Sequence, residues 1–511
     1  EYSHAEDTGM MRRKLSGGMV IASLLFATAL TAGGPDTRLM DAAKEKDTAA
    51  VRSLLQQKVD VNTSAPDGAT ALHWAAHMND MATAQLLVSA GANVRASNLY
   101  GVTPLSLACT NGAAAMIELL LKAGADPNTT MPEGETALMT AARTGNVDAL
   151  EALLSHGAGV NTKESWRGQT ALMWAAGEGH AAAVERLIEA GADIRARSNG
   201  GFTPLLFAVR EGQSAAVRVL VKAGADVNET LPARNRPRRN GASGSAGTKT
   251  GLSALDLAVA NAHFELAAVL LDAGADPNAA GPGWTPLHTI TWVRKPGKGS
   301  NDPAPPGSGN MDSLELVRRL AAKGADLNAR MTSRTPAGAS SLNMIGATPF
   351  LMAARTGDAE LMRLLAELGA DPLLPNEDNT TPFIVAAGVG TRSPGEDAGT
   401  ESEVLAAVKV ALELGNDINA VDKHGETAMH GAAYKHLPSV VQFLASNGAR
   451  LEIWNRKNDL GWTPLRIAEG VHRTLNFRSS PPTAAVLRKL MSAAGVPTVV
   501  EPETVISGST R

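Results

Sequence analysis

A short triplet recurs along this chain and constrains its fold more than any other feature. It consists of Thr or Ser, then Pro or Ala, then an apolar residue, and it begins at Thr70, Thr103, Thr136, Thr170, Thr203, Ser253, Thr285, Thr348, Thr381, Thr427 and Thr463. Most neighbouring triplets lie 32 to 36 residues apart, and gaps of 50, 63 and 46 residues mark insertions. A second marker, Gly-Ala-Asp/Asn or a close variant, trails the triplets from Gly91 to Gly448. Two markers in step over this length predict a repeat solenoid, in which each unit packs on its neighbours.

Each marker has a physical function within a predicted unit of two helices. The Thr is placed to accept hydrogen bonds from free N–H groups at a helix start, and a Pro in the next position has no N–H to lose. A second helix follows with apolar spacing such as Val184, Leu187 and Ile188. Gly then ends it in the left-handed conformation, before an Asp/Asn-rich turn. With aromatic residues at 4% and 50 glycines, the chain suits many thin layers better than one thick core.

The sequences of the repeats resemble those of the ankyrin repeat family. Thr285-Pro286-Leu287-His288 is similar to the family's TPLH signature, and Gly224-Ala225-Asp226-Val227-Asn228 is similar to its GADVN signature. The resemblance covers roughly residues 36–496. It implies an all-α repeat solenoid of about twelve helix-turn-helix units with short hairpin-like turns, forming a curved, elongated rod. It also implies a concave face, formed by the turns and the first helices, that binds another protein.

The repeat predicts the following division of the chain. We expect an N-terminal capping repeat at 36–68, an array at 69–461, a C-terminal capping repeat at 462–496 and a flexible tail at 497–511. Insertions interrupt the array at 229–251, 293–310, 329–346 and 388–402, and another falls at about 472–482. They mark a binding face, or they are neutral loop growth, since long surface insertions cost little stability.

The N-terminal residues have the pattern of a secretory signal peptide at 10–32. Arg12-Arg13-Lys14 precede an apolar stretch, 19–30, and small residues follow it, with cleavage expected after Ala29 or Ala32. The stretch is short for a membrane span, so we expect no stable membrane insertion. The alternative is a frayed apolar leader. We interpret residues 1–9, which precede Met10, as an upstream gene-model extension.

Charge and cysteine content say little about partners or compartment. The net charge is −4, whereas a nucleic-acid-binding protein is usually basic, so we expect no nucleic-acid partner. A basic run from Arg234 to Arg239 lies in the first insertion and is a phosphate patch or, more simply, a solvated loop. The single cysteine, Cys109, excludes an internal disulfide and replaces the second Ala of an Ala pair, which predicts a small buried side chain.

No catalytic or metal-binding constellation was found. The chain lacks HExxH, CxxC and a phosphate-binding loop, so we expect no enzyme activity, no metal and no cofactor. His424, His430 and His436 recur every six residues, but His430 is the fourth residue of a TPLH-like signature. The family resemblance gives that residue a structural hydrogen-bonding role. A spacing of six residues across a turn and a helix also does not bring three imidazoles together on a metal.

The resemblance places a partner against the turns and against the residues just after each Ala pair. Carried over to this sequence, the predicted partner-binding residues are Tyr100, Arg143, Trp166, Phe202, Arg210, Trp284, Trp292, Arg355, Tyr434 and Trp462. Interface hot spots favour Trp, Tyr and Arg. The other interpretation is that these aromatic side chains seal adjacent turns together. By contrast, Trp74, Trp174 and Phe207 occupy a position filled elsewhere by Leu107, Leu257 and Val385, so we expect them in the core.

These features predict a non-enzymatic scaffold that binds a protein on its concave face. We expect a monomer, exported to the periplasm of a bacterium or secreted. One alternative is an inhibitor or immunity-type protein that blocks an enzyme by the same face. Another alternative is an enzyme whose site is formed by the C-terminal insertions. The acidic residues there, Glu396, Asp397 and Glu401, are more simply interpreted as a solvated acidic loop.

Overall fold

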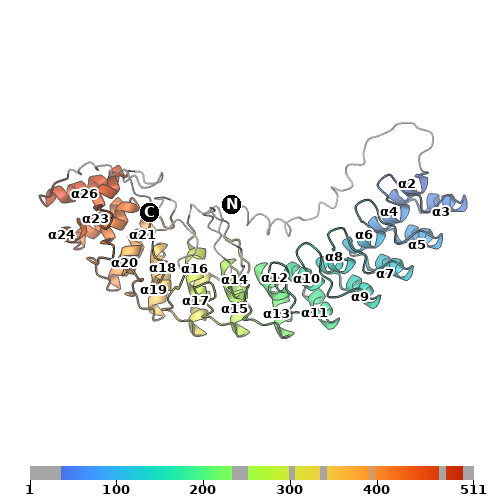
Figure 1. The fold of residues 1–511 in the computed structure, drawn as a ribbon, viewed down its shortest axis with the longest axis horizontal. Helices are drawn as coiled ribbons and strands as arrows, with labels where there is room; N and C mark the ends of the chain where they lie inside the picture. Colours follow the sequence, from blue (N-terminus) through green and yellow to red (C-terminus); the bar gives the residue numbers. More distant parts are fainter. Residues whose placement is uncertain are drawn as a thin grey trace. The chain divides into compact units, whose positions relative to one another are not determined.

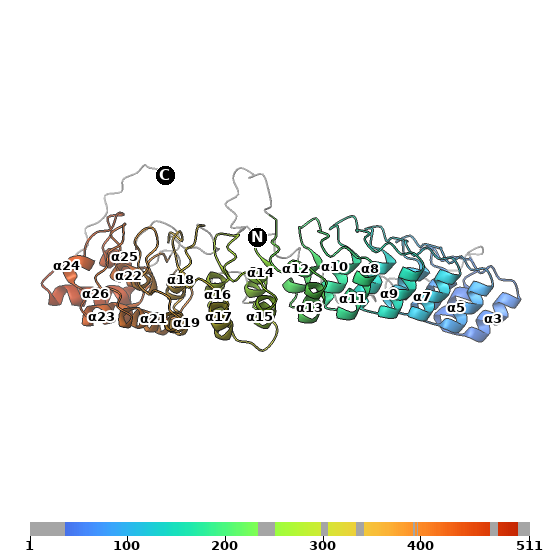
Figure 2. The same ribbon diagram turned by 90° about the horizontal axis from the view of Figure 1, so that it is seen from below.

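The structure, a computed structural model, describes residues 36–232, 251–297, 305–333, 342–391, 394–395, 397–470 and 479–498. The described residues fall into two compact units, unit 1 up to Asp226 and unit 2 from Val227 onward. Figures 1 and 2 show the helices of each unit stacked in chain order. The predicted signal peptide at 10–32, the basic run in the first insertion and the end of the tail lie outside the described residues.

Each unit consists of six helix pairs. In unit 1 the helices are α2 Arg38–Lys44, α3 Thr48–Gln56, α4 Ala71–His77, α5 Met81–Ser89, α6 Pro104–Thr110, α7 Ala114–Lys122, α8 Ala137–Thr144, α9 Val147–Ser155, α10 Ala171–Glu178, α11 Ala181–Glu189, α12 Pro204–Arg210 and α13 Ser214–Lys222. In unit 2 they are α14 Ala254–Ala260, α15 Phe264–Asp272, α16 Pro286–Arg294, α17 Ser313–Ala322, α18 Pro349–Arg355, α19 Ala359–Glu367, α20 Pro382–Ala386, α21 Glu401–Glu413, α22 Ala428–Tyr434, α23 Pro438–Ser446, α24 Leu451–Trp454, α25 Pro464–Glu469 and α26 Pro481–Ala493. Short α24 lies in the turn before the last pair.

The pairs stack as two layers within each unit. The first helices pack on one another as an inner layer, α2 on α4 and α4 on α6, and the second helices form an outer layer, α3 on α5 and α5 on α7. The turn from an outer helix to the next inner helix is called a finger below. The described residues contain no strand, and three isolated antiparallel bridges close fingers, at Ser64–Thr70, Thr130–Thr136 and Thr230–Ser253. The predicted all-α solenoid of twelve units is confirmed.

Threonine begins the inner helices as predicted. The Thr103 Oγ1 atom accepts a hydrogen bond from the N–H of Ser106 at 3.1 Å, which satisfies one of the free donors at the start of α6. The same bond occurs at Thr136, Thr170, Thr203, Ser253, Thr348, Thr381 and Thr463. These inner helices therefore start where their own sequence places the cap.

Histidine strengthens this cap at three repeats and links it to the next finger. The Nδ1 atom accepts a hydrogen bond from the backbone N–H of the capping Thr, and Nε2 lies 3.1 Å from a carbonyl oxygen of the following finger. The pairs are His73 with Val102, His288 with Ala347 and His430 with Arg456. Burial lowers the pKa of His288 and His430 to about 4, so both rings are neutral at pH 7. The predicted structural role of His430 is confirmed.

Glycine ends the outer helices for a conformational reason. From Gly91 to Gly448, the ten glycines of the second marker all have φ between +86° and +106°. A Cβ atom at any of them would have nothing within 4 Å. Glycine is therefore required at these positions because the left-handed backbone conformation disfavours a β-carbon, and not because space is lacking.

An asparagine ladder joins successive fingers. The Asn161 Nδ2 atom donates to the carbonyl of Gly191 at 3.0 Å, and its Oδ1 accepts from the N–H of Asp193 at 2.8 Å. Equivalent pairs of bonds start from Asn62, Asn128, Asn228, Asn278 and Asn419. Where Arg95 replaces the asparagine, its Nε atom donates to Gly124 at 2.7 Å. The last residue of the GADVN-like motif therefore fixes the spacing between repeats.

We expect Asn161→Ala to destabilise unit 1 by about 1 kcal/mol, because two inter-repeat hydrogen bonds are replaced by bonds to water. Thermal and urea unfolding followed by circular dichroism measure the change. Gln85→Ala, at an exposed position of α5, serves as the control. Equal midpoints for the two variants would show that the ladder contributes nothing to stability.

The insertions lie at two kinds of position. Those after α16, α20 and α25 fall between the two helices of a pair, whereas those after α13 and α17 lengthen fingers. Among the described helices, none is long and apolar enough to cross a membrane.

Candidate protein-binding surface

Three large apolar side chains project from finger tips of unit 1. Leu99 is 77% exposed, Tyr100 56% and Trp166 60%. Leu99 and Tyr100 share one finger, and Trp166 lies two fingers further along the chain. Exposed large hydrophobic side chains at such turns are candidates for an interaction site. These three residues, together with Arg143, Phe202 and Arg210 of the same unit, are called the unit 1 finger surface below.

Hydrogen bonds inside each finger hold these tips in place. The Asn98 Oδ1 atom accepts from the N–H groups of Tyr100 at 3.0 Å and Val102 at 2.9 Å. In the finger of Trp166, the buried carboxylate of Glu164 accepts from the N–H groups of Trp166 at 2.6 Å and Gln169 at 2.9 Å. The backbone N–H groups of each finger therefore have hydrogen-bond partners within the finger. The exposed side chains lie on an ordered turn, so little conformational entropy of the backbone is lost when a partner binds.

Neighbouring fingers also bond to one another along the row. The N–H of Leu99 donates to the carbonyl of Asp67 at 2.8 Å, and the N–H of Ser165 donates to Glu133 at 3.1 Å. The N–H of Asn199 donates to the carbonyl of Arg167 at 2.7 Å. These bonds join the finger of Asp67 to that of Leu99, and the fingers of Glu133, Ser165 and Asn199 to one another.

Cations at the ends of inner helices lie over aromatic rings. The Arg143 guanidinium is 5.6 Å from the centre of the Trp174 ring, and Arg210 is 5.0 Å from the rings of both Phe202 and Phe207. Both arginines are the seventh residue after a capping Thr, as is Trp292 in unit 2. A half-buried cation over a ring is stabilised by the ring quadrupole. Each arginine also pairs with a carboxylate of its own chain, Arg143 with Glu135 at 3.5 Å and Arg210 with Glu211 at 2.8 Å.

Two of the three side chains predicted in the core are only half-buried. Phe207 is buried, as predicted, but Trp74 and Trp174 are partly exposed. Their rings are covered by cations of the preceding repeat, Lys44 at 4.8 Å and Arg143 at 5.6 Å. An indole is larger than the Leu or Val of other repeats, and its outer edge therefore extends beyond the layer.

In unit 2, Trp284 is not available to a partner. It is 9% exposed and lies in a cluster with Met331, Leu342 and Met344, against which Trp292 packs at a ring distance of 5.8 Å. The residues that cover it come from the insertion at 329–346, which adds apolar side chains to this finger. The prediction that Trp284 contacts a partner is wrong, and its position fits the other interpretation, in which the aromatic side chains seal fingers together.

Tyr434 is also buried, at 7% exposure. Its hydroxyl donates to Glu426 Oε1 at 3.0 Å and accepts from Asn458 Nδ2 at 3.0 Å, and burial raises the pKa of Glu426 to about 7. A buried phenol with both partners within the protein is structural, so this residue too is removed from the predicted contact set. Trp462, in the following finger, remains half-buried.

Arg355 remains in the predicted set with a different environment. It is half-buried at the end of α18, and desolvation lowers its pKa while Asp397 opposes the shift. Of the ten predicted contact residues, Tyr100, Arg143, Trp166, Phe202 and Arg210 belong to unit 1 and are at least partly exposed, as are Trp292, Arg355 and Trp462 of unit 2.

A metal cluster and a reactive cysteine thiol are the two kinds of chemical site at issue in the part of the chain that the structure describes. No group of three His, Cys, Asp or Glu side chains that could hold a metal ion occurs among the described residues. Cys109 is fully buried in α6, and burial raises the pKa of its thiol, so it is a packing residue as predicted.

Comparison with known families agrees with this geometry. Ankyrin repeat models match residues 39–131 and 138–230 as groups of three copies, 114–154 as many copies, and 250–281 and 345–377 as single repeats. Together the matches cover half of the chain. The chain belongs to the ankyrin repeat family. Ankyrin repeats form protein–protein interaction scaffolds, and this chain therefore has the architecture of one.

Similar proteins match this chain over less than half of its length. An ankyrin repeat and KH domain-containing protein of Caenorhabditis briggsae is 30% identical over 233 residues, which are 42% of this chain and 8% of that protein. The E3 ubiquitin-protein ligase KEG of Arabidopsis thaliana is 27% identical over 250 residues, 42% of this chain and 14% of that protein. The chain thus spans a small part of either relative. The crystal structure of the human ASB11 ankyrin repeat domain is 26% identical, with a TM-score of 0.40, covering 47% of this chain and 98% of that one.

Proposed function

We propose that this ankyrin repeat protein is a non-enzymatic scaffold that binds a protein partner through the unit 1 finger surface. One observation carries the proposal: Leu99, Tyr100 and Trp166 are more than half exposed on finger tips whose backbones are held by internal hydrogen bonds. Rigid aromatic side chains beside arginine are the composition of binding hot spots. The partner supplies an apolar patch for the exposed rings.

The double variant Tyr100→Ala/Trp166→Ala tests this proposal. The loss of two hot-spot side chains is expected to weaken partner binding by at least about 30-fold, which corresponds to about 2 kcal/mol. Partners captured on the immobilised wild-type protein are identified by mass spectrometry, and their affinities for both proteins are then measured with purified components. The variant should unfold at the wild-type temperature, because neither side chain is buried.

Leu373→Ala is the matched control, since Leu373 is a 48% exposed apolar finger residue of unit 2. Equal affinities for the wild type, the double variant and this control would exclude the unit 1 finger surface as the binding site. An inhibitor or immunity-type function uses the same surface. It is supported only if the captured partner is an enzyme that loses activity on binding.

We also propose export to the periplasm or the exterior. The support is the sequence of 10–32, a basic segment followed by an apolar stretch and small residues. Cell fractionation with N-terminal sequencing of the mature protein tests it. A protein found in the cytosol with residues 10–32 intact contradicts export.

A further inference from the structure

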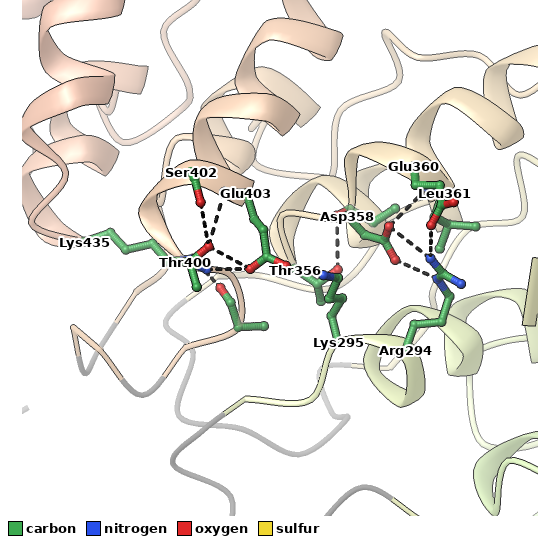
Figure 3. Close-up of polar contacts among 12 residues, drawn as sticks. Arg294, Lys295, Thr356, Asp358, Glu360, Leu361, Thr400, Ser402, Glu403 and Lys435 are labelled. Carbon is green, nitrogen blue, oxygen red and sulfur yellow. Dashed lines mark hydrogen bonds and ion pairs between the residues drawn. The ribbon is translucent and has the colours of Figure 1, made fainter. Parts of the chain in front are cut away.

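The insertion that follows α16 begins with two cations that bond to two later outer helices. The Arg294 Nε atom donates to Asp358 Oδ2 at 2.7 Å, and its Nη2 atom donates to Glu360 Oε2 at 3.0 Å (Figure 3). Asp358 is the N-cap residue of α19, in the next repeat. The following residue, Lys295, forms an ion pair with Glu403 of α21, two repeats away. Adjacent residues of one segment are therefore bonded to two successive outer helices.

The other described end of the insertion bonds to the preceding repeat. The Ser308 Oγ atom lies 2.9 Å from Nδ1 of His263, the N-cap residue of α15. The N–H of Asn310 donates to Glu265 Oε2 at 3.0 Å. A Cβ atom at Gly309 would lie 2.5 Å from the same carboxylate oxygen, so glycine permits this close contact. The described ends of the insertion thus contact the N-termini of outer helices in three other repeats, α15, α19 and α21.

A bond that skips a repeat differs from the bonds at the equivalent loops of unit 1. There the Asn146 Nδ2 atom donates to the carbonyl of Gly112 at 2.7 Å, and these partners are 34 residues apart, about one repeat. Lys295 and Glu403 are 108 residues apart. Coupling in a solenoid normally passes from each repeat to its neighbour. The ion pair therefore gives α16 and α21 a direct link.

The two cations differ in their exposure to solvent. The side chains of Arg294 and Asp358 are 13% and 2% exposed, whereas those of Lys295 and Glu403 are 32% and 38% exposed. A buried ion pair is little screened by salt, but an exposed pair weakens as ionic strength rises. The bond from Lys295, together with two bonds from Thr400, lowers the pKa of Glu403 to about 2. Near neutral pH the exposed pair therefore responds to ionic strength and not to pH.

The start of α21 also contacts the repeats on either side of it. Its first residue, Glu401, accepts hydrogen bonds at Oε1 from the N–H of Ser439 at 2.8 Å and from Ser439 Oγ at 2.6 Å. Ser439 lies in the first turn of α23. On the other side, a Cβ atom at Gly399 would lie 3.2 Å from the carbonyl oxygen of Thr356, which follows α18. A change at Lys295 therefore acts on a segment that touches three other repeats.

We infer that Arg294 and Lys295 form a brace that couples α21 directly to α16 across the intervening repeat, with Arg294 as a fixed anchor and Lys295 as an end that salt releases. Because Arg294 stays bound to Asp358, release of Lys295 frees the start of α21 and leaves α19 in place. The brace is a conformational device within unit 2. It requires no partner and shares no residue with the unit 1 finger surface.

Hydrogen exchange of the full chain, followed by mass spectrometry, tests the brace. Lys295→Met keeps an apolar stem and removes the charge. It should speed exchange in the first turns of α21 by about two- to fivefold, the change that loss of an exposed ion pair permits. Exchange in α18 and α19 should not change, because Arg294 still holds α19. Lys323→Met is the matched control, since Lys323 pairs with Asp272 of the adjacent repeat at 3.0 Å, and it should leave α21 unchanged.

Salt distinguishes the two ends of the brace. Raising the NaCl concentration from about 50 to about 500 mM should speed exchange in α21 of the wild type but not of Lys295→Met, which has no pair to screen. Exchange in α19 should stay the same in both proteins. Glu403→Gln removes the carboxylate charge, and its combination with Lys295→Met should match Lys295→Met alone, because both changes remove the same pair.

Each part of the inference can be overturned separately. Unchanged exchange of α21 in Lys295→Met overturns the brace. Equal acceleration of α19 and α21 in that variant shows that coupling passes through the intervening repeat, and overturns the direct link. An equal effect of salt on α21 in the wild type and in Lys295→Met overturns the release of Lys295 by salt. Faster exchange of α19 at high salt overturns the role of Arg294 as a fixed anchor.

Discussion

Replacing Gly388 with alanine is expected to destabilise unit 2 by about 3 kcal/mol, the largest effect of a single methyl group that we predict for this protein. Two costs add. A left-handed backbone disfavours a β-carbon by about 1–2 kcal/mol, and φ at this position is +115°. The new Cβ would also lie 2.7 Å from the carbonyl oxygen of Gly431, so that α20 and α22 must move apart.

Gly415→Ala is the matched control for this prediction. Gly415 has φ +92°, but a Cβ atom there would have nothing within 4 Å, so only the conformational cost of about 1 kcal/mol remains. Urea unfolding of both variants, followed by circular dichroism and by hydrogen exchange of unit 2, compares them. If the two variants lose equal stability, the close approach of Gly388 to Gly431 is not under steric constraint.

The second large effect concerns Asp256, which occupies the position of the cap histidines in α14. It is fully buried. Its Oδ2 atom accepts from Ser253 Oγ at 2.9 Å, while Oδ1 is buried without a partner. Burial raises the pKa of this carboxyl from 3.8 to about 7, with Asp276 adding slightly. A group with a raised pKa contributes its full stability below about pH 4, and the contribution is lost as the pH rises through 7.

Asp256→Asn should therefore abolish this loss, since the amide stays neutral at every pH. The variant is expected to match the wild type near pH 4 and to exceed its stability by up to about 4 kcal/mol at pH 8. Unfolding midpoints measured from pH 4 to 8 test this, with the exposed Asp148→Asn as a control for the removal of one charge. A stability difference that does not change with pH would show that burial of Asp256 is not linked to its ionisation.

Local features of this protein could be predicted from its sequence because they depend on residues close together along the chain. A Thr cap acts on the N–H three residues later, and a left-handed Gly depends on its own φ. The helix bounds therefore follow the markers, as in α6, which begins directly after Thr103. The asparagine ladder was missed, since each Asn bonds to the neighbouring repeat, although its regular recurrence was a visible signal.

The candidate site could be predicted only in part, because exposure depends on segments far away in sequence. Trp166 and Trp284 are both finger residues that precede a capping Thr, yet one is 60% exposed and the other 9%. The difference comes from Met331 and Met344 of a later insertion, which cover Trp284. Tyr434 is likewise buried by bonds to Asn458, 24 residues onward.

The sequence by itself determined the repeat, its helix caps, its glycine stops and the absence of recognisable catalytic motifs, because each of these is a local pattern repeated many times. Only the tertiary structure decided which aromatic side chains face solvent, which cations lie over aromatic rings, and that the side chain of Lys435 is buried. Those properties arise where different repeats and their insertions pack together. The physical reason is that the burial of a side chain depends on residues that are near it in space. A repeat pattern specifies how the helix pairs stack, but it does not specify which side chains an irregular loop covers.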